Sequence, residues 1–172
     1  MTEAPRTVHV ARPKAVASWT FEIRERDQKG DLVARVDMGK AWTQGDLHVG
    51  DIPFEVDRQG LSRAYALLFE GQTVARAEPA GTLSNSYVIE TEGGFLASGV
   101  EIGDRVAFVL EPTSFASSSC RFRSGEEVWG EIVKESMLFR HFALRFHPGV
   151  PLALQAFCLA LMLARLRRQS NG

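Results

Sequence analysis

The stretch VPLALQAFCLALMLARL, residues 150–166, is apolar on every side when drawn as a helix, and it decides the fold of this chain. A helix without a polar face has to be enclosed, either by the protein itself or by lipid. The run from Val150 to Ala164 would span about 22 Å, less than the ~30 Å hydrocarbon layer of a bilayer. Gln155 interrupts the run and Arg165 closes it. We therefore predict a helix buried in the protein core.

The alternative is a tail-anchored membrane protein whose remaining residues form a cytosolic domain. Arg165, Arg167 and Arg168 follow the apolar run directly. In a tail anchor these arginines would face away from the cytoplasm, against the tendency of basic residues to stay on the cytoplasmic side. Charge placement therefore also favours the core helix.

Segments of alternating polarity fill most of the chain before the helix. Trp19, Phe21 and Ile23 alternate with polar residues, as in a half-buried strand. The stretches GDLVARV (30–36) and GQTVARA (71–77) are similar to each other, and each reads as the return strand of a hairpin. Strands are expected at 19–23, 32–36, 46–49, 53–56, 65–69, 73–77, 87–90, 95–97, 106–110, 120–123, 127–132 and 140–146. About a dozen short strands with regular turns predict a sandwich or a barrel.

Length and composition indicate one globular domain. The chain has 172 residues, of which 45% are hydrophobic and 24% charged, as is usual for a soluble domain. We expect a flexible arm at 1–16, the β domain at 17–168 and a short tail at 169–172. The net charge of -1 argues against a general nucleic-acid binder. No signal peptide is apparent, so we expect a cytoplasmic protein with reduced cysteines.

The order of elements resembles the tubby C-terminal-domain superfamily, which includes the LURP-one-related proteins and the phospholipid scramblases. The most similar pieces are the hairpin FEI…GDLVARV, the stretch FRSGEEVWGEIVKES and the terminal PLALQAFCLALMLARLRR. The resemblance implies a closed antiparallel barrel of about twelve strands with a hydrophobic helix running through its centre. It also implies a link to lipid head groups or membrane surfaces, although no residue matches the lipid-binding positions of tubby.

The most suggestive functional feature is a set of basic side chains on two late strands. Arg121 and Arg123 flank Phe122, so both should point outward if Phe122 points into the core. His141 and Arg145 should also point outward if the phenylalanines of the last strand face inward. We expect these four residues to form a patch for an anionic head group, with a solvated strand face as the alternative.

Catalytic and metal-binding patterns are weak. The four histidines lack a metal-binding spacing, and Cys120 and Cys158 form no metal motif. The expectation is therefore a non-enzymatic binding or scaffold module that uses no cofactor or metal. Its expected partner is an anionic lipid or membrane surface, with the protein in the cytoplasm or peripheral at that surface. The alternatives are the tail anchor and an enzyme with a site at the barrel mouth.

Overall fold

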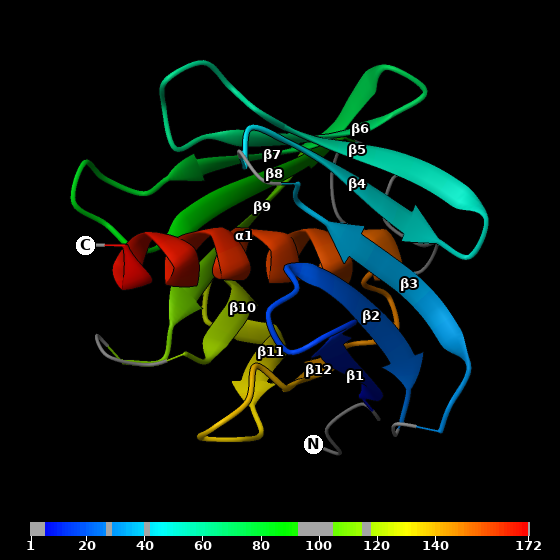
Figure 1. Cartoon of the computed structure of the whole chain (residues 1–172). Helices are drawn as coiled ribbons and strands as arrows, with labels where there is room; N and C mark the ends of the chain where they lie inside the picture. The colour runs from blue at the N-terminus through cyan, green and yellow to red at the C-terminus, as the bar shows by residue number, and fades with distance from the viewer. Residues whose placement is uncertain (1–5, 27–28, 40–41, 93–104, 115–117, 172) are drawn as a thin grey trace.

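A computed structural model describes residues 6–26, 29–39, 42–92, 105–114 and 118–171 of the chain. Within these residues, twelve strands form one closed antiparallel barrel, and one helix, α1 (Leu152–Ser170), follows them (Figure 1). The strands are β1 (Thr7–Pro13), β2 (Thr20–Glu25), β3 (Leu32–Asp37), β4 (Gln44–Val49), β5 (Ile52–Arg58), β6 (Tyr65–Phe69), β7 (Gln72–Pro79), β8 (Tyr87–Glu92), β9 (Arg105–Pro112), β10 (Cys120–Ser124), β11 (Glu127–Lys134) and β12 (Phe142–Phe146). The predicted fold class is confirmed.

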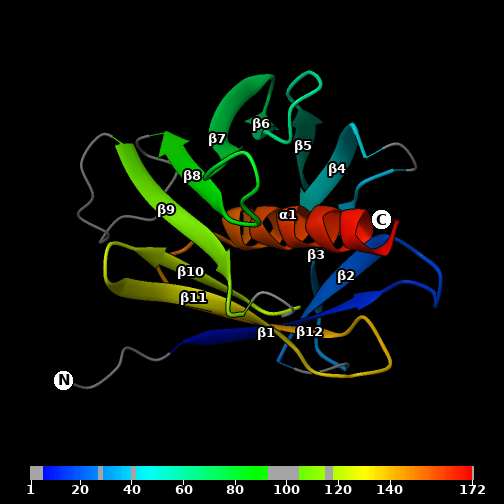
Figure 2. The ribbon, with the colours of Figure 1, turned by 90° about the vertical axis from the view of Figure 1, so that its left-hand side faces the viewer.

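The helix α1 lies inside the barrel, with strands above and below it in Figure 2. Every residue from Ala153 to Arg165 is buried, so no side of this stretch faces solvent. The prediction of a helix wrapped by the sheet of the same chain is confirmed, and the tail-anchor alternative does not match this position. Among the residues that the structure describes, no helix combines the length and the hydropathy that crossing a membrane requires.

Small and aromatic side chains share the space between the sheet and α1. Ala34, Ala75 and Ala77 are buried on the inner face of the barrel, where short side chains leave room for the helix. The rings of Phe108 on β9 and Phe122 on β10 stack with centroids 4.4 Å apart, and both are buried in the core. Buried aromatic and aliphatic side chains of this kind contribute about 1.5–3 kcal/mol each, so the filled interior is the main source of stability.

One expectation for the N-terminal residues was wrong. We expected 1–16 to be an arm outside the barrel, but Thr7–Pro13 forms β1, which pairs with both β2 and β12 and closes the sheet. The sequence pattern did not reveal this strand, because the apolar Val8 is exposed and the side chain that faces the core is the small Ala11. Pairing on both edges, rather than an apolar face, makes this segment a strand. The expected strand at 95–97 lies outside the described residues.

The antiparallel order sends successive connections to opposite ends of the barrel. The loops β1–β2, β3–β4, β5–β6, β7–β8, β9–β10 and β11–β12 gather where α1 ends, which we call the exit end (left in Figure 1, facing the viewer in Figure 2). The opposite ends of the strands gather where α1 begins, which we call the entry end. Residues far apart in sequence therefore meet at each end.

Candidate functional site

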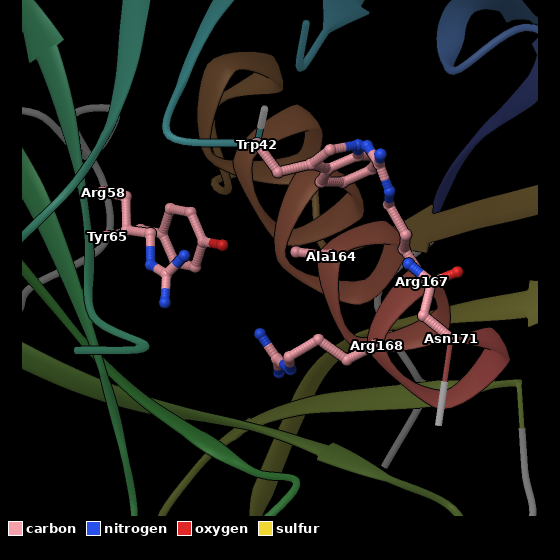
Figure 3. Close-up of a pocket in the computed structure, with 7 residues that line it drawn as sticks. All are labelled: Trp42, Arg58, Tyr65, Ala164, Arg167, Arg168 and Asn171. Atoms are coloured by element: carbon pink, nitrogen blue, oxygen red, sulfur yellow. The ribbon is translucent and has the colours of Figure 1, made fainter. Parts of the chain in front are cut away.

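A pocket of about 350 Å³ opens at the exit end, beside the last turns of α1 (Figure 3). This volume lies within the range of small-ligand sites. Its lining comes from the β3–β4 loop, β5, β6 and the helix, and consists of Trp42, Arg58, Tyr65, Ala164, Arg167, Arg168 and Asn171. We call this set the anion pocket, because its charged side chains are all arginines.

Arg58 stands at the end of β5, on the face that points into the barrel. It has the same parity as the buried Val56, and it pairs in register with Tyr65 of β6. Its Nε donates to the carbonyl oxygen of Ser62 at 2.8 Å, and its Nη2 donates to that of Leu61 at 3.4 Å. These hydrogen bonds position the guanidinium at the pocket and do not use Nη1. Both acceptors are neutral, so they leave the positive charge uncompensated.

Arg168 approaches the same space from the last turn of α1. Its Nη2 donates to the phenolic oxygen of Tyr87 at 3.0 Å, which again is a neutral acceptor. In Figure 3 the guanidinium groups of Arg58 and Arg168 flank the opening, and Ala164 lies on the helix beside it. A larger side chain than Ala164 would occupy this space, so the small residue keeps the pocket open.

Tyr65 places a hydroxyl in the pocket between these two arginines (Figure 3). Burial raises the pKa of Tyr65 and the nearby Tyr87 adds to the rise, while the positive charges of Arg168 and Arg58 oppose it. The phenol therefore stays protonated at neutral pH and can donate a hydrogen bond to an anion.

Trp42 forms the opposite wall together with Arg167. The guanidinium carbon of Arg167 lies 5.0 Å from the ring centroid of Trp42, and this ring meets Trp19 edge to face at 5.0 Å. Such a cation–π contact orients the guanidinium group. Trp42 has a φ of +56°, a left-handed conformation that costs a bulky residue about 1–3 kcal/mol. The packing of its ring holds the backbone in this strained form.

The charge balance of the pocket is positive. The C-terminus of α1 contributes about half a negative charge at this end, whereas the lining contributes the guanidinium groups of Arg58, Arg167 and Arg168. Among the described residues no ion pair involves Arg58 or Arg168, and none of those that line the pocket is acidic. An anion entering here meets fixed cationic donors, which form the stronger class of hydrogen bond.

The four residues expected from the sequence lie elsewhere, and the structure does not gather them into one cluster. Arg121 and Arg123 are on the outer face of β10, Arg145 is on the outer face of β12, and β11 runs between them. His141 lies in the β11–β12 loop, where its ring stacks on Phe139 at 5.4 Å. The outward directions inferred for the strand residues are confirmed by the burial of Phe122 and its equivalents on β12.

Carboxylates alternate with these wall arginines. Arg123 Nε donates to Glu111 at 2.8 Å, and Arg145 lies 3.6 Å from Glu131. Arg121 faces Glu131 on one side and Glu111 on the other in the strand register. Arg123 lowers the pKa of Glu111 through this hydrogen bond, which keeps the carboxylate charged. The wall is therefore a ladder of alternating charge, and head-group binding there stays a prediction.

The entry end has a larger pocket with mixed charge. Its pocket of about 650 Å³ is lined by His9, Glu25, Arg26 and others, so a carboxylate accompanies the basic groups. A larger volume alone does not make a binding site. The smaller anion pocket is the better candidate because its charges have one sign.

Neither comparison with known proteins identifies a relative: no protein-family model matches the chain, and no functionally curated protein matches it. Within the described residues there is also no group of three or more histidine, cysteine or acidic side chains that could hold a metal ion. Cys120 and Cys158 are both free and buried. Function is therefore inferred from the geometry of the exit end.

Sequence reasoning missed the anion pocket because its residues come from distant parts of the chain. Arg58 ends one strand, Tyr65 begins the next and Arg168 lies about a hundred residues later. One signal was present: basic residues end an otherwise apolar helix, at the point where it must leave the barrel. The loops expected around that end of the helix were therefore the place to look for a site.

Proposed function

We propose that this protein is a non-enzymatic binding module that holds a phosphate-bearing group in the anion pocket. One observation carries the proposal: the guanidinium groups of Arg58 and Arg168 converge on a pocket, and the partners that the described residues offer each of them are neutral oxygen atoms. Arginine presents several donors in a fixed plane and suits the tetrahedral oxygens of a phosphate. The phenol of Tyr65 adds a neutral donor beside them.

The chemistry of the lining favours binding over catalysis. The described lining residues include no carboxylate, histidine or cysteine, the groups that most often act as general acids, bases or nucleophiles. The pocket instead presents cationic donors between aromatic walls, an arrangement that suits the binding of an anion. A tubby-like kinship with a role at lipid head groups would agree with this chemistry, and it remains part of the proposal.

Titration calorimetry with inorganic phosphate tests the pocket directly. We expect saturable binding that weakens at least about tenfold in Arg58→Gln and in Arg168→Gln, because each substitution removes a charge-assisted hydrogen bond. Arg76→Gln is the matched control, since Arg76 is exposed on the outer face of β7. Thermal melts of the variants show whether each still folds. Absence of saturable binding up to about 10 mM phosphate would refute the proposal, as would equal loss in the control.

A further inference from the structure

The most exposed large apolar side chains of the described residues all stand at the exit end, in loops that surround the anion pocket. Their exposed fractions are 86% for Val16, 100% for Leu61, 94% for Leu83, 97% for Met137 and 87% for Leu138. They come from the β1–β2, β5–β6, β7–β8 and β11–β12 loops, which frame α1 in Figure 2. We call these five residues the apolar rim.

Within the part of the chain that the structure describes, exposed large apolar residues elsewhere are fewer and less exposed. Leu32 and Ile52 begin β3 and β5 at the entry end, and their exposed fractions are 41% and 51%. Single exposed apolar side chains are common on soluble proteins and need no explanation. The gathering of the fully exposed ones at one end, around one pocket, is what calls for a function.

Arg140 fixes the rim on one side of the pocket. Its Nη2 donates to the carbonyl oxygens of Val16 at 2.9 Å and Ser18 at 2.8 Å, which ties the β11–β12 loop to the β1–β2 loop. Its guanidinium carbon also lies 4.3 Å from the ring centroid of Trp19. The loop that carries Met137 is thus joined to the loop that carries Val16.

Arg63 does the same on the other side. It belongs to the β5–β6 loop and donates to the carbonyl oxygens of Thr82 and Ser84, on either side of Leu83 in the β7–β8 loop. Ser62 further shapes its own loop by donating to the carbonyl oxygen of Gln59 at 2.6 Å. The two arginines therefore hold the apolar tips in an outward position, which costs less entropy on binding than ordering mobile loops.

The charges of the exit end fit an anionic surface. In its described loops and the last turn of α1, basic residues outnumber the acidic one: Lys14, Arg63, Arg140, Arg167 and Arg168 against Glu135. In the described loops of the entry end the balance is reversed, with Arg26 and Lys29 against Asp31, Asp51, Glu70 and Glu126. The net charge of -1 conceals this polarity along the barrel axis.

Separate apolar tips around a cationic centre suit a bilayer better than a protein partner. A protein interface needs a continuous, closely packed apolar core. A bilayer surface accepts single side chains that enter between head groups, while basic groups contact the lipid phosphates. From this geometry we infer that the exit end docks on an anionic lipid surface, with the apolar rim inserted and a lipid phosphate in the anion pocket. For that lipid phosphate, the inference rests on the proposed function.

Vesicle co-sedimentation tests the rim. Full-length protein is mixed with vesicles of phosphatidylcholine containing about 30% phosphatidylserine, or of phosphatidylcholine alone. We expect binding to the anionic vesicles, weakened about tenfold in the double variant Leu61→Ser and Leu83→Ser. The control double variant Leu32→Ser and Ile52→Ser removes the same kind of side chain at the entry end. It should bind like the wild type.

A fluorescent label reports which end enters the lipid. Cys120 and Cys158 are buried, and burial raises the pKa of Cys120 to about 11, so a thiol introduced at the surface reacts selectively. An environment-sensitive dye on Leu83→Cys should shift to the blue with anionic vesicles, whereas the same dye on Ile52→Cys should not.

Phosphate calorimetry and vesicle co-sedimentation together separate failure of this inference from failure of the proposed function. Binding of inorganic phosphate without binding of vesicles would overturn the rim inference and leave the anion pocket intact. Vesicle binding that depends on the rim but is unchanged in Arg58→Gln would support insertion and remove the pocket as the head-group site. Equal vesicle binding by both double variants would overturn the inference. So would a dimer that dissociates on the Leu61→Ser and Leu83→Ser changes, since the rim would then meet a second copy.

Discussion

At the exit end of the barrel, exposed apolar loop tips surround a pocket lined by arginines; at the entry end, acidic and basic side chains mix around a larger pocket. Both ends are made by connections between the same antiparallel strands and close on the same helix. The barrel wall and core therefore do not dictate what an end displays. This difference is the reason for proposing the function at the exit end rather than at the entry end.

The largest effect is expected from a substitution in α1, the helix on which both ends of the barrel close. Leu159 is fully buried in the middle of α1, so Leu159→Asp places an unpaired charge inside the barrel and should cost about 3–5 kcal/mol. We expect loss of the cooperative thermal transition in circular dichroism, with both ends affected. Leu61→Asp makes the same chemical change at a fully exposed loop position and should melt like the wild type. A folded Leu159→Asp protein would contradict the enclosed helix.

A moderate effect should arise near the entry end alone. A Cβ on Gly130 of β11 would lie 2.3 Å from Cδ1 of Phe146, so the ring must move to make room. Gly130→Ala should lower the free energy of unfolding in urea by about 1–3 kcal/mol, as overpacked cores do. Gly81→Ala is the control, because its nearest neighbour is the Cβ of Ser84 at 3.8 Å. Phosphate binding at the exit end should persist in Gly130→Ala, and its loss would mean that the two ends are coupled.

The smallest effect concerns pH and the entry end. Burial lowers the pKa of His9, while Gln155 and Glu25 oppose the shift. The unfolded chain therefore binds this proton more readily, and stability present above pH 6.5 is lost as the pH falls through the lowered pKa. His9→Asn should flatten the fall in unfolding free energy between about pH 7.5 and 5.5.

Two other histidines define the controls for this comparison. Burial also lowers the pKa of His141 at the exit end, so part of the pH dependence should remain in His9→Asn. His48 is exposed on β4, so His48→Asn is the control for the effect of replacing a histidine at the surface on the stability at pH 7.5. A His9→Asn curve that coincides with the wild type would show that His9 does not contribute to the acid sensitivity.

Sequence patterns predicted the core well because burial leaves a local mark. Alternation at Phe21 and Ile23 marks a strand with one face inside, and uninterrupted apolarity around Leu159 marks a helix enclosed on all sides. The same logic failed for β1, whose inward position is the small Ala11 and whose outward Val8 is apolar. This segment is a strand because it pairs with β12 and closes the sheet, and a local sequence pattern does not show such long-range pairing.

For the candidate functional residues, the sequence predicted the direction of single side chains but not their neighbours. The wall arginines Arg121, Arg123 and Arg145 were placed on the correct outer face, but the carboxylates between them appear only when strands are paired. The rim had a faint signal, since Leu61 and Leu83 interrupt loops that are otherwise polar and rich in glycine and serine. That signal does not indicate a common surface until both loops are known to lie at the same end of the barrel.

By itself, the order of apolar and polar residues determined an enclosed helix, the strands β2 to β12 and one core, because hydrophobic burial acts on every residue according to its own side chain and near neighbours. Only the tertiary structure decided which connections share an end, that Arg58 meets Arg168, and that five apolar tips stand around them. Strand order and chain direction bring these residues together across many intervening positions, and no short-range pattern records that geometry.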